Sequence, residues 1–288
     1  MTTTRQSTFG ATLRTTILLA TLSGLLVGIG FLIGGTSTAL VFLFLAALLN
    51  MGTYFFSDKI ALKMSRAQPI SESEAPRLYQ IVRELTTRAE LPMPSLHMIP
   101  ADQPNAFATG RNPKHSAVAV TRGITQLLSE DELRGVIAHE LAHVKHRDIL
   151  ITSVAATIGA AITYLGYMLL WFGGGDEGDS PLGMIGALAM VLLAPIAATI
   201  IQLSISRQRE YAADAGGAAI SGNPESLASA LLRLEEGAKA MPMQVNQAAE
   251  PLYIVKPFSG RGFASLFSTH PPIEERVRRL RQMRPSLI

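Results

Sequence analysis

The first quarter of the chain is dominated by one long apolar run. No charged residue occurs between Thr15 and Ser57. The run is too long for one membrane crossing, which needs about 20 residues, and Gly34-Gly35-Thr36-Ser37 interrupts it near the middle. The pattern predicts two helices, Thr15–Ile33 and Ala39–Phe56, joined by a tight turn as a transmembrane hairpin. A cleaved signal peptide would be shorter and would end at a small-residue cleavage site.

A second pair of apolar stretches, Ile149–Phe172 and Leu182–Ser204, lies in the middle of the chain. The connecting segment Gly173–Pro181 is acidic and contains neither Lys nor Arg, which is typical of a loop outside the cytoplasm. We expect both stretches to span the membrane. Pro195 and Gln202 interrupt the second stretch, so a hydrophobic hairpin buried within protein is the alternative.

The flanking charges predict the orientation of the first hairpin. Arg5 and Arg14 precede it, and Lys59, Lys63 and Arg66 follow it, whereas the turn between its helices is uncharged. The positive-inside rule therefore places the N-terminus and the segment after the hairpin in the cytoplasm. The expected location is the inner, or cytoplasmic, membrane of the cell, with several crossings.

The remaining segments are polar and predict a small mixed domain. Glu74–Glu90 has the apolar spacing of an amphipathic helix, and Leu96–Ile99 and Ala117–Thr121 are short strand candidates, with Asn105–Gly110 as a third. Ser129-Glu-Asp-Glu132 has the pattern of a capping box at the start of a further helix. The expected fold is mainly α with a small β-sheet, an α+β domain interrupted by membrane helices.

This reading divides the chain into four parts. Residues 1–57 form the N-terminal hairpin, residues 58–148 and 205–288 form the two parts of one cytoplasmic domain, and residues 149–204 form the second hydrophobic pair. The chain has no cysteine, which excludes disulfides, thiolate zinc sites and cysteine nucleophiles. The net charge of +3 and the few aromatic residues give no indication of nucleic-acid binding.

The strongest chemical signal is His139-Glu-Leu-Ala-His143, an H-E-x-x-H motif inside a predicted helix. Histidines at positions i and i+4 lie on one helical face, so both imidazoles can reach a single Zn2+. Glu140 then lies beside the metal, where it can act as the general base for a water molecule. Two surface histidines on a solvated face are the weaker interpretation.

A catalytic zinc ion needs a third protein ligand. His146 lies on the same continuous helix and could join the pair only with distortion. Glu210, in a helix that follows the last hydrophobic stretch, is the best candidate, and Asp214 falls on the same face, placed to accept the N–H of a ligand histidine. An exposed charged face containing Arg209, Glu210 and Asp214 is equally compatible with this pattern.

Three motifs together, His139–His143, Ser206–Asp214 and Ser268-Thr-His-Pro271, resemble the HtpX membrane metalloproteases, relatives of the CAAX prenyl endopeptidases. The resemblance covers nearly the whole chain and implies a gluzincin-like metalloprotease domain. It implies that Glu210 is the third zinc ligand and that Asp214 supports the site.

The same resemblance implies roles for two further segments. His270 and Arg276 are expected to approach the active site and to help stabilise the tetrahedral intermediate. The segment Asn105–Gly110 is expected to be an edge strand that holds an extended substrate, with Asn105, Ala106, Phe107 and Ala108 in contact with it.

The predicted function is a zinc endopeptidase, with one Zn2+ per chain, and the resemblance implies a role in membrane-protein quality control and the stress response. It would cleave misfolded or damaged membrane proteins, or other unfolded polypeptides, at the cytoplasmic face of the lipid bilayer. Membrane proteases or chaperones are expected partners. A prenyl-protein endopeptidase is a second enzyme hypothesis, and a non-catalytic zinc-containing membrane scaffold or sensor is the alternative from another class.

Overall fold

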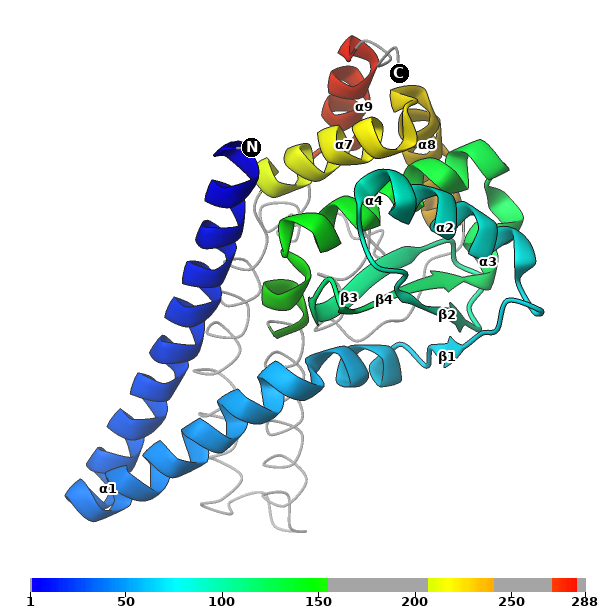
Figure 1. Cartoon of the computed structure of the whole chain (residues 1–288). Helices are drawn as coiled ribbons and strands as arrows, with labels where there is room; N and C mark the ends of the chain where they lie inside the picture. The colour runs from blue at the N-terminus through cyan, green and yellow to red at the C-terminus, as the bar shows by residue number, and fades with distance from the viewer. Residues whose placement is uncertain (1, 155–206, 241–270, 284–288) are drawn as a thin grey trace.

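The computed structural model describes residues 2–154, 207–240 and 271–283. A long N-terminal helix, α1 (Thr2–Met64), leads into a small sheet and a group of helices that pack against it (Figure 1). Of the second hydrophobic pair, only residues 149–154 are described, and they are helical. The rest of that pair and His270 lie outside the described residues.

Helix α1 consists of two arms that meet at a glycine pair. Gly34 (φ −151°, ψ 26°) and Gly35 (φ 66°, ψ −155°) are not helical, and Gly35 has the positive φ that favours glycine. The chain reverses direction there (Figure 1), and Asn50 Nδ2 donates a hydrogen bond of 2.8 Å to Ser23 Oγ across the two arms. The predicted break between two helices is confirmed, although the first helix begins at Thr2 rather than Thr15.

The second arm of α1 is exposed and apolar. Among the described residues, Gly34–Met64 is the one helix long and apolar enough to cross a membrane. Large apolar side chains face outward along it, with 63 % of Phe44 and 61 % of Leu40 exposed. Such a contiguous apolar surface is typical of contact with lipid rather than water.

The sheet has four strands in the order β1-β2-β4-β3. Strand β2 (Ser95–Ile99) pairs parallel with β4 (His115–Thr121), and β3 (Ala106–Asn112) pairs antiparallel with β4 at the sheet edge. All three predicted strands are confirmed. Strand β1 (Gln68–Pro69) was not predicted, because two residues that include a proline carry no strand pattern.

Both faces of the sheet are covered. Helices α2 (Pro76–Ala89) and α4 (Glu130–His146) pack on one face together with α8 (Pro224–Ala240), and their apolar side chains form the main core. On the other face, Phe107 and Ala119 pack with Ala61 near the end of α1. The C-terminal end of α1 is therefore attached directly to the edge strand β3.

The remaining helices complete the domain. Short α3 (Arg122–Leu127) follows β4 and was not predicted, whereas the predicted amphipathic helix is α2. The capping box is confirmed: Ser129 Oγ accepts from the Glu132 N–H, and Glu132 accepts from the Ser129 N–H. Helix α7 (Arg207–Ser221) crosses α4, and α9 (Ile273–Gln282) packs against α7 and α8.

Candidate metal centre

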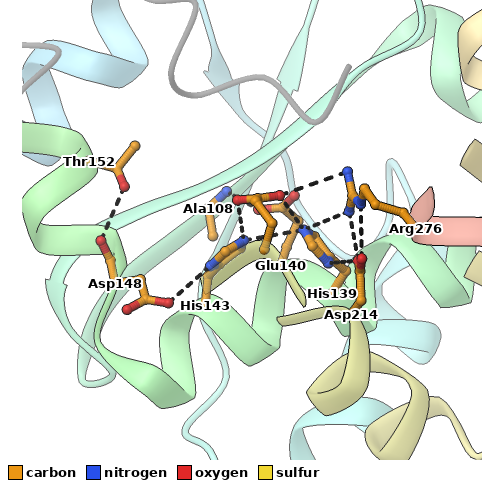
Figure 2. Close-up of polar contacts among 9 residues, drawn as sticks. Ala108, His139, Glu140, His143, Asp148, Thr152, Asp214 and Arg276 are labelled. Carbon is orange, nitrogen blue, oxygen red and sulfur yellow. Dashed lines mark hydrogen bonds and ion pairs between the residues drawn. The ribbon is translucent and has the colours of Figure 1, made fainter. Parts of the chain in front are cut away.

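The H-E-x-x-H motif lies in the second half of α4, and its two histidines converge. His139 and Glu140 are buried and His143 is mostly buried. The Nε2 atoms of His139 and His143 are 3.2 Å apart, so both point toward one place beside the helix (Figure 2). This is the geometry that the i, i+4 spacing predicts for two ligands of a single metal ion.

Helix α7 supplies a carboxylate to the same place. Glu210 Oε1 is 3.5 Å from His143 Nε2, and Glu210 Oε2 is 3.7 Å from His139 Nε2. The ligand atoms of His139, His143 and Glu210 all lie within 4.8 Å of one another. Glu210 is buried, so the interpretation of this segment as an exposed charged face is wrong.

A close crossing of α4 and α7 brings these residues together. A Cβ atom added to Gly217 would lie 2.8 Å from the backbone N and 2.9 Å from the Cα of His139. These distances are shorter than an ordinary contact, so only glycine fits there without a shift of the helices. Asp214 lies about one turn and Glu210 about two turns before Gly217, which explains why both reach the motif face of α4.

Asp214 holds the first histidine and is itself held by α9. His139 Nδ1 is 3.0 Å from Asp214 Oδ1. Arg276 donates two hydrogen bonds to Asp214, from Nε at 2.9 Å and from a terminal nitrogen at 2.7 Å. Burial alone would raise the pKa of Asp214, but the charge of Arg276 and these bonds lower it to about 2. Asp214 is therefore ionised.

Asp148 lies beside the second histidine, and the sequence analysis did not identify it. His143 Nδ1 is 3.3 Å from Asp148 Oδ2. Burial alone would lower the pKa of His143, but Asp148 and Glu210 raise it to about 9. The sequence does show an aspartate just after the motif helix. Its contact with His143 depends on the turn that ends the helix, which the sequence does not predict.

Glu140 is positioned beside the histidines and is held by the sheet. The backbone N–H of Ala108 in β3 donates a hydrogen bond of 2.8 Å to Glu140 Oε2 (Figure 2). Burial raises the pKa of Glu140 to about 7. A carboxyl group with this pKa can both accept and donate a proton near neutral pH, which suits a general base that later acts as an acid.

The donor set fits a bound metal ion. A carboxylate oxygen lies 3.0 Å from Nδ1 of His139 and 3.3 Å from Nδ1 of His143, and the Nε2 atoms of both rings face Glu210. This arrangement leaves Nε2 of each ring as the atom that can bind a metal ion. Two imidazoles and one carboxylate form a set that zinc enzymes use. Within the described residues, His146 is not part of this converging group.

The other predicted site residues that the structure describes lie around the converging group rather than in it. Asn105, Ala106, Phe107 and Ala108 are all buried in or just before β3. Asn105 Oδ1 accepts from the Ala106 N–H, and Phe107 faces α1. The Ala108 N–H contacts Glu140 of the motif. Arg276 is completely buried at the centre, with Asp214 as its main partner.

Comparison with known proteins agrees with this site. The profile of Peptidase family M48 matches residues 72–284. The chain is 53 % identical to the Protease HtpX homolog of Syntrophobacter fumaroxidans, over 95 % of this chain and 100 % of the relative. It is 54 % identical to the Protease HtpX homolog of Pelotomaculum thermopropionicum, over 94 % and 98 %.

Among solved structures, the Ste24p protein of S. mikatae is similar, with a TM-score of 0.49 and 19 % identity, over 96 % of this chain and 66 % of that one. The family match covers about three quarters of the sequence and includes every residue of the converging group. The chain therefore belongs to Peptidase family M48 and is a metalloprotease.

Proposed function

We propose that this protein is a membrane-embedded zinc endopeptidase that hydrolyses peptide bonds in membrane proteins or unfolded polypeptides near the cytoplasmic face. The observation that carries the proposal is the convergence of His139, His143 and Glu210 beside a buried Glu140. Zn2+ is the proposed metal because two imidazoles and a carboxylate suit it and leave a position for substrate.

The proposed chemistry divides between the metal and Glu140. A bound Zn2+ would act as a Lewis acid toward the scissile carbonyl and would make water more acidic. Glu140 takes the proton from the attacking water and gives it to the leaving amine. The Ala108 N–H holds the carboxylate during both transfers.

Arg276 and His270 have different proposed roles. Arg276 donates two hydrogen bonds to Asp214, and its other terminal nitrogen lies 3.8 Å from Glu210 Oε2. We therefore assign Arg276 to orienting Asp214 and to compensating the negative charge of Asp214 and Glu210. His270 stays a candidate donor to the developing oxyanion.

Strand β3 is the proposed site for an extended substrate, with Asn105, Ala106, Phe107 and Ala108 along it. A strand at a sheet edge can pair with a peptide backbone and so accept many sequences. Because β3 also packs against the end of α1, this strand would lie near the membrane surface. Substrates cut close to their membrane segments would suit this arrangement.

The cellular proposals follow from that arrangement. We propose the four-part organisation of residues 1–57, 58–148, 149–204 and 205–288, with several membrane crossings and the catalytic parts in the cytoplasm. Removal of damaged membrane proteins under stress, with membrane proteases or chaperones as partners, is the proposed role. Membership of Peptidase family M48 disfavours a non-catalytic scaffold.

The test is the change Glu140→Gln in the full chain purified in detergent. Proteolysis of casein should fall by about 100- to 10,000-fold because the base is lost, whereas bound zinc should stay at the wild-type level. A chelator should abolish wild-type activity, and zinc should restore it. Glu90→Gln, a change on the exposed C-cap of α2, is the control and should have no effect. If Glu140→Gln keeps wild-type activity, the proposed function is wrong.

A further inference from the structure

The turn that follows α4 brings the next residue of the chain, Asp148, close to the candidate metal centre. The helix ends at Arg147, whose φ of 61° is left-handed, and the Asp148 N–H donates a 3.0 Å hydrogen bond to the carbonyl oxygen of His143. This turn places Asp148 next to the ring of His143, five residues earlier in the sequence. Figure 2 shows the Asp148 side chain directed at that ring.

The carboxylate of Asp148 is buried beside the ring of His143. Asp148 is 4 % exposed, and its Oδ2 lies 3.3 Å from His143 Nδ1. A carboxylate oxygen accepts hydrogen bonds, so its position next to Nδ1 favours the form of the ring that carries its hydrogen there.

We infer that Asp148 is a positioning residue for the metal centre, which orients His143 as Asp214 orients His139. The two carboxylates face the Nδ1 atoms of the two histidines, whose Nε2 atoms converge. A ring that lost this partner could rotate or place its hydrogen on Nε2, and then its lone pair would no longer point to the metal position. This inference rests on the proposed function only for the identity of the metal.

Asp148 also has a backbone role that must be separated from its carboxylate. Its carbonyl oxygen accepts a 3.3 Å hydrogen bond from the Thr152 N–H and a 3.2 Å bond from Thr152 Oγ1 at the start of the next helix. A substitution at Asp148 leaves that carbonyl in place. Thr152→Val removes the side-chain bond to the same carbonyl but keeps the carboxylate, so it is the matched control.

The experiment measures zinc affinity of the full chain in detergent by competition with a chromophoric chelator. Asp148→Ala should raise the zinc dissociation constant about 10- to 100-fold, as for other residues that orient ligand histidines. Asp148→Asn keeps an acceptor oxygen without the charge and should give a smaller increase. Thr152→Val should bind zinc like the wild type. Saturating zinc should restore proteolysis to Asp148→Ala, because Glu140 is intact.

Two results would overturn the inference. One is a dissociation constant for Asp148→Ala within about twofold of the wild type, well short of the usual loss. The other is an equal loss of affinity in Thr152→Val, which would assign the effect to the helix turn. Neither depends on Glu140, so failure of the proposed catalytic role and failure of the Asp148 role remain distinguishable. Unfolding midpoints measured in excess chelator show whether each variant is folded.

Discussion

A glycine-to-alanine change inside a helix usually stabilises a protein. The close crossing of α4 and α7 predicts the opposite at Gly217, together with weaker zinc binding. Gly217→Ala adds a methyl group 2.8 Å from the backbone N and 2.9 Å from the Cα of His139. Neither of these atoms can move without moving α4. Ordinary contacts between carbon atoms are about 3.5–4.0 Å, so the two helices must separate by roughly 0.6–1 Å at this point, on the same estimate.

Two opposing contributions decide the stability of this variant. Overpacking a well-packed contact costs about 1–3 kcal/mol, whereas replacing glycine by alanine inside a helix contributes about 1 kcal/mol of stability. The net change in the free energy of unfolding should therefore be a destabilisation of about 0–2 kcal/mol, from the difference of these terms. Zinc affinity should fall by about tenfold or more, because the separation moves Glu210 away from the two histidines.

The assay combines chemical unfolding of the metal-free chain with zinc competition. Ala219→Gly is the matched control, because Ala219 is exposed on the same helix. It should lose about 1 kcal/mol from helix propensity alone and should bind zinc normally. The close-crossing argument is refuted if Gly217→Ala is stabilised by about 1 kcal/mol, the propensity value, and keeps wild-type zinc affinity.

Two other changes test separate parts of the structure. Asp214→Asn removes the carboxylate charge nearest to Arg276, which is 0 % exposed and is left with Glu210 at 3.8 Å, so the free energy of unfolding should fall by about 3 kcal/mol. Chemical unfolding in excess chelator measures this, and a loss below about 1 kcal/mol would contradict a buried ion pair. Ser129→Ala removes the capping hydroxyl and should cost about 1 kcal/mol with unchanged zinc affinity; a weakened metal site would show that the cap also positions the motif.

From the residues alone, the metal centre could be predicted only for ligands that lie close together in the sequence. His139 and His143 lie on one helix, so their spacing alone determines that they share a face. The capping box was predictable for the same reason. Glu210 needs a helix crossing that the sequence does not encode locally, which is why the residues alone left it open and a family resemblance was needed to select it.

The residues that the sequence reasoning missed depend on tertiary contacts. Asp148 reaches His143 through a left-handed turn at Arg147, a non-glycine residue that gives no signal of such a turn. The Ala108 contact with Glu140 uses a backbone N–H, so no side chain could reveal it. Arg276 lies 3.8 Å from Glu210 Oε2, and its two hydrogen bonds to Asp214 follow from the packing of α9 against α7, which the sequence does not reveal.

X-ray absorption at the zinc edge of the metal-loaded protein tests the central claim most directly, because it reports the ligands themselves. The account predicts one zinc ion per chain with two imidazole nitrogens at about 2.0–2.1 Å and oxygen ligands that include one protein carboxylate. In Glu210→Ala, an oxygen contribution should change while the two imidazoles remain. A third imidazole in the wild type, or a spectrum unaffected by Glu210→Ala, would contradict the account.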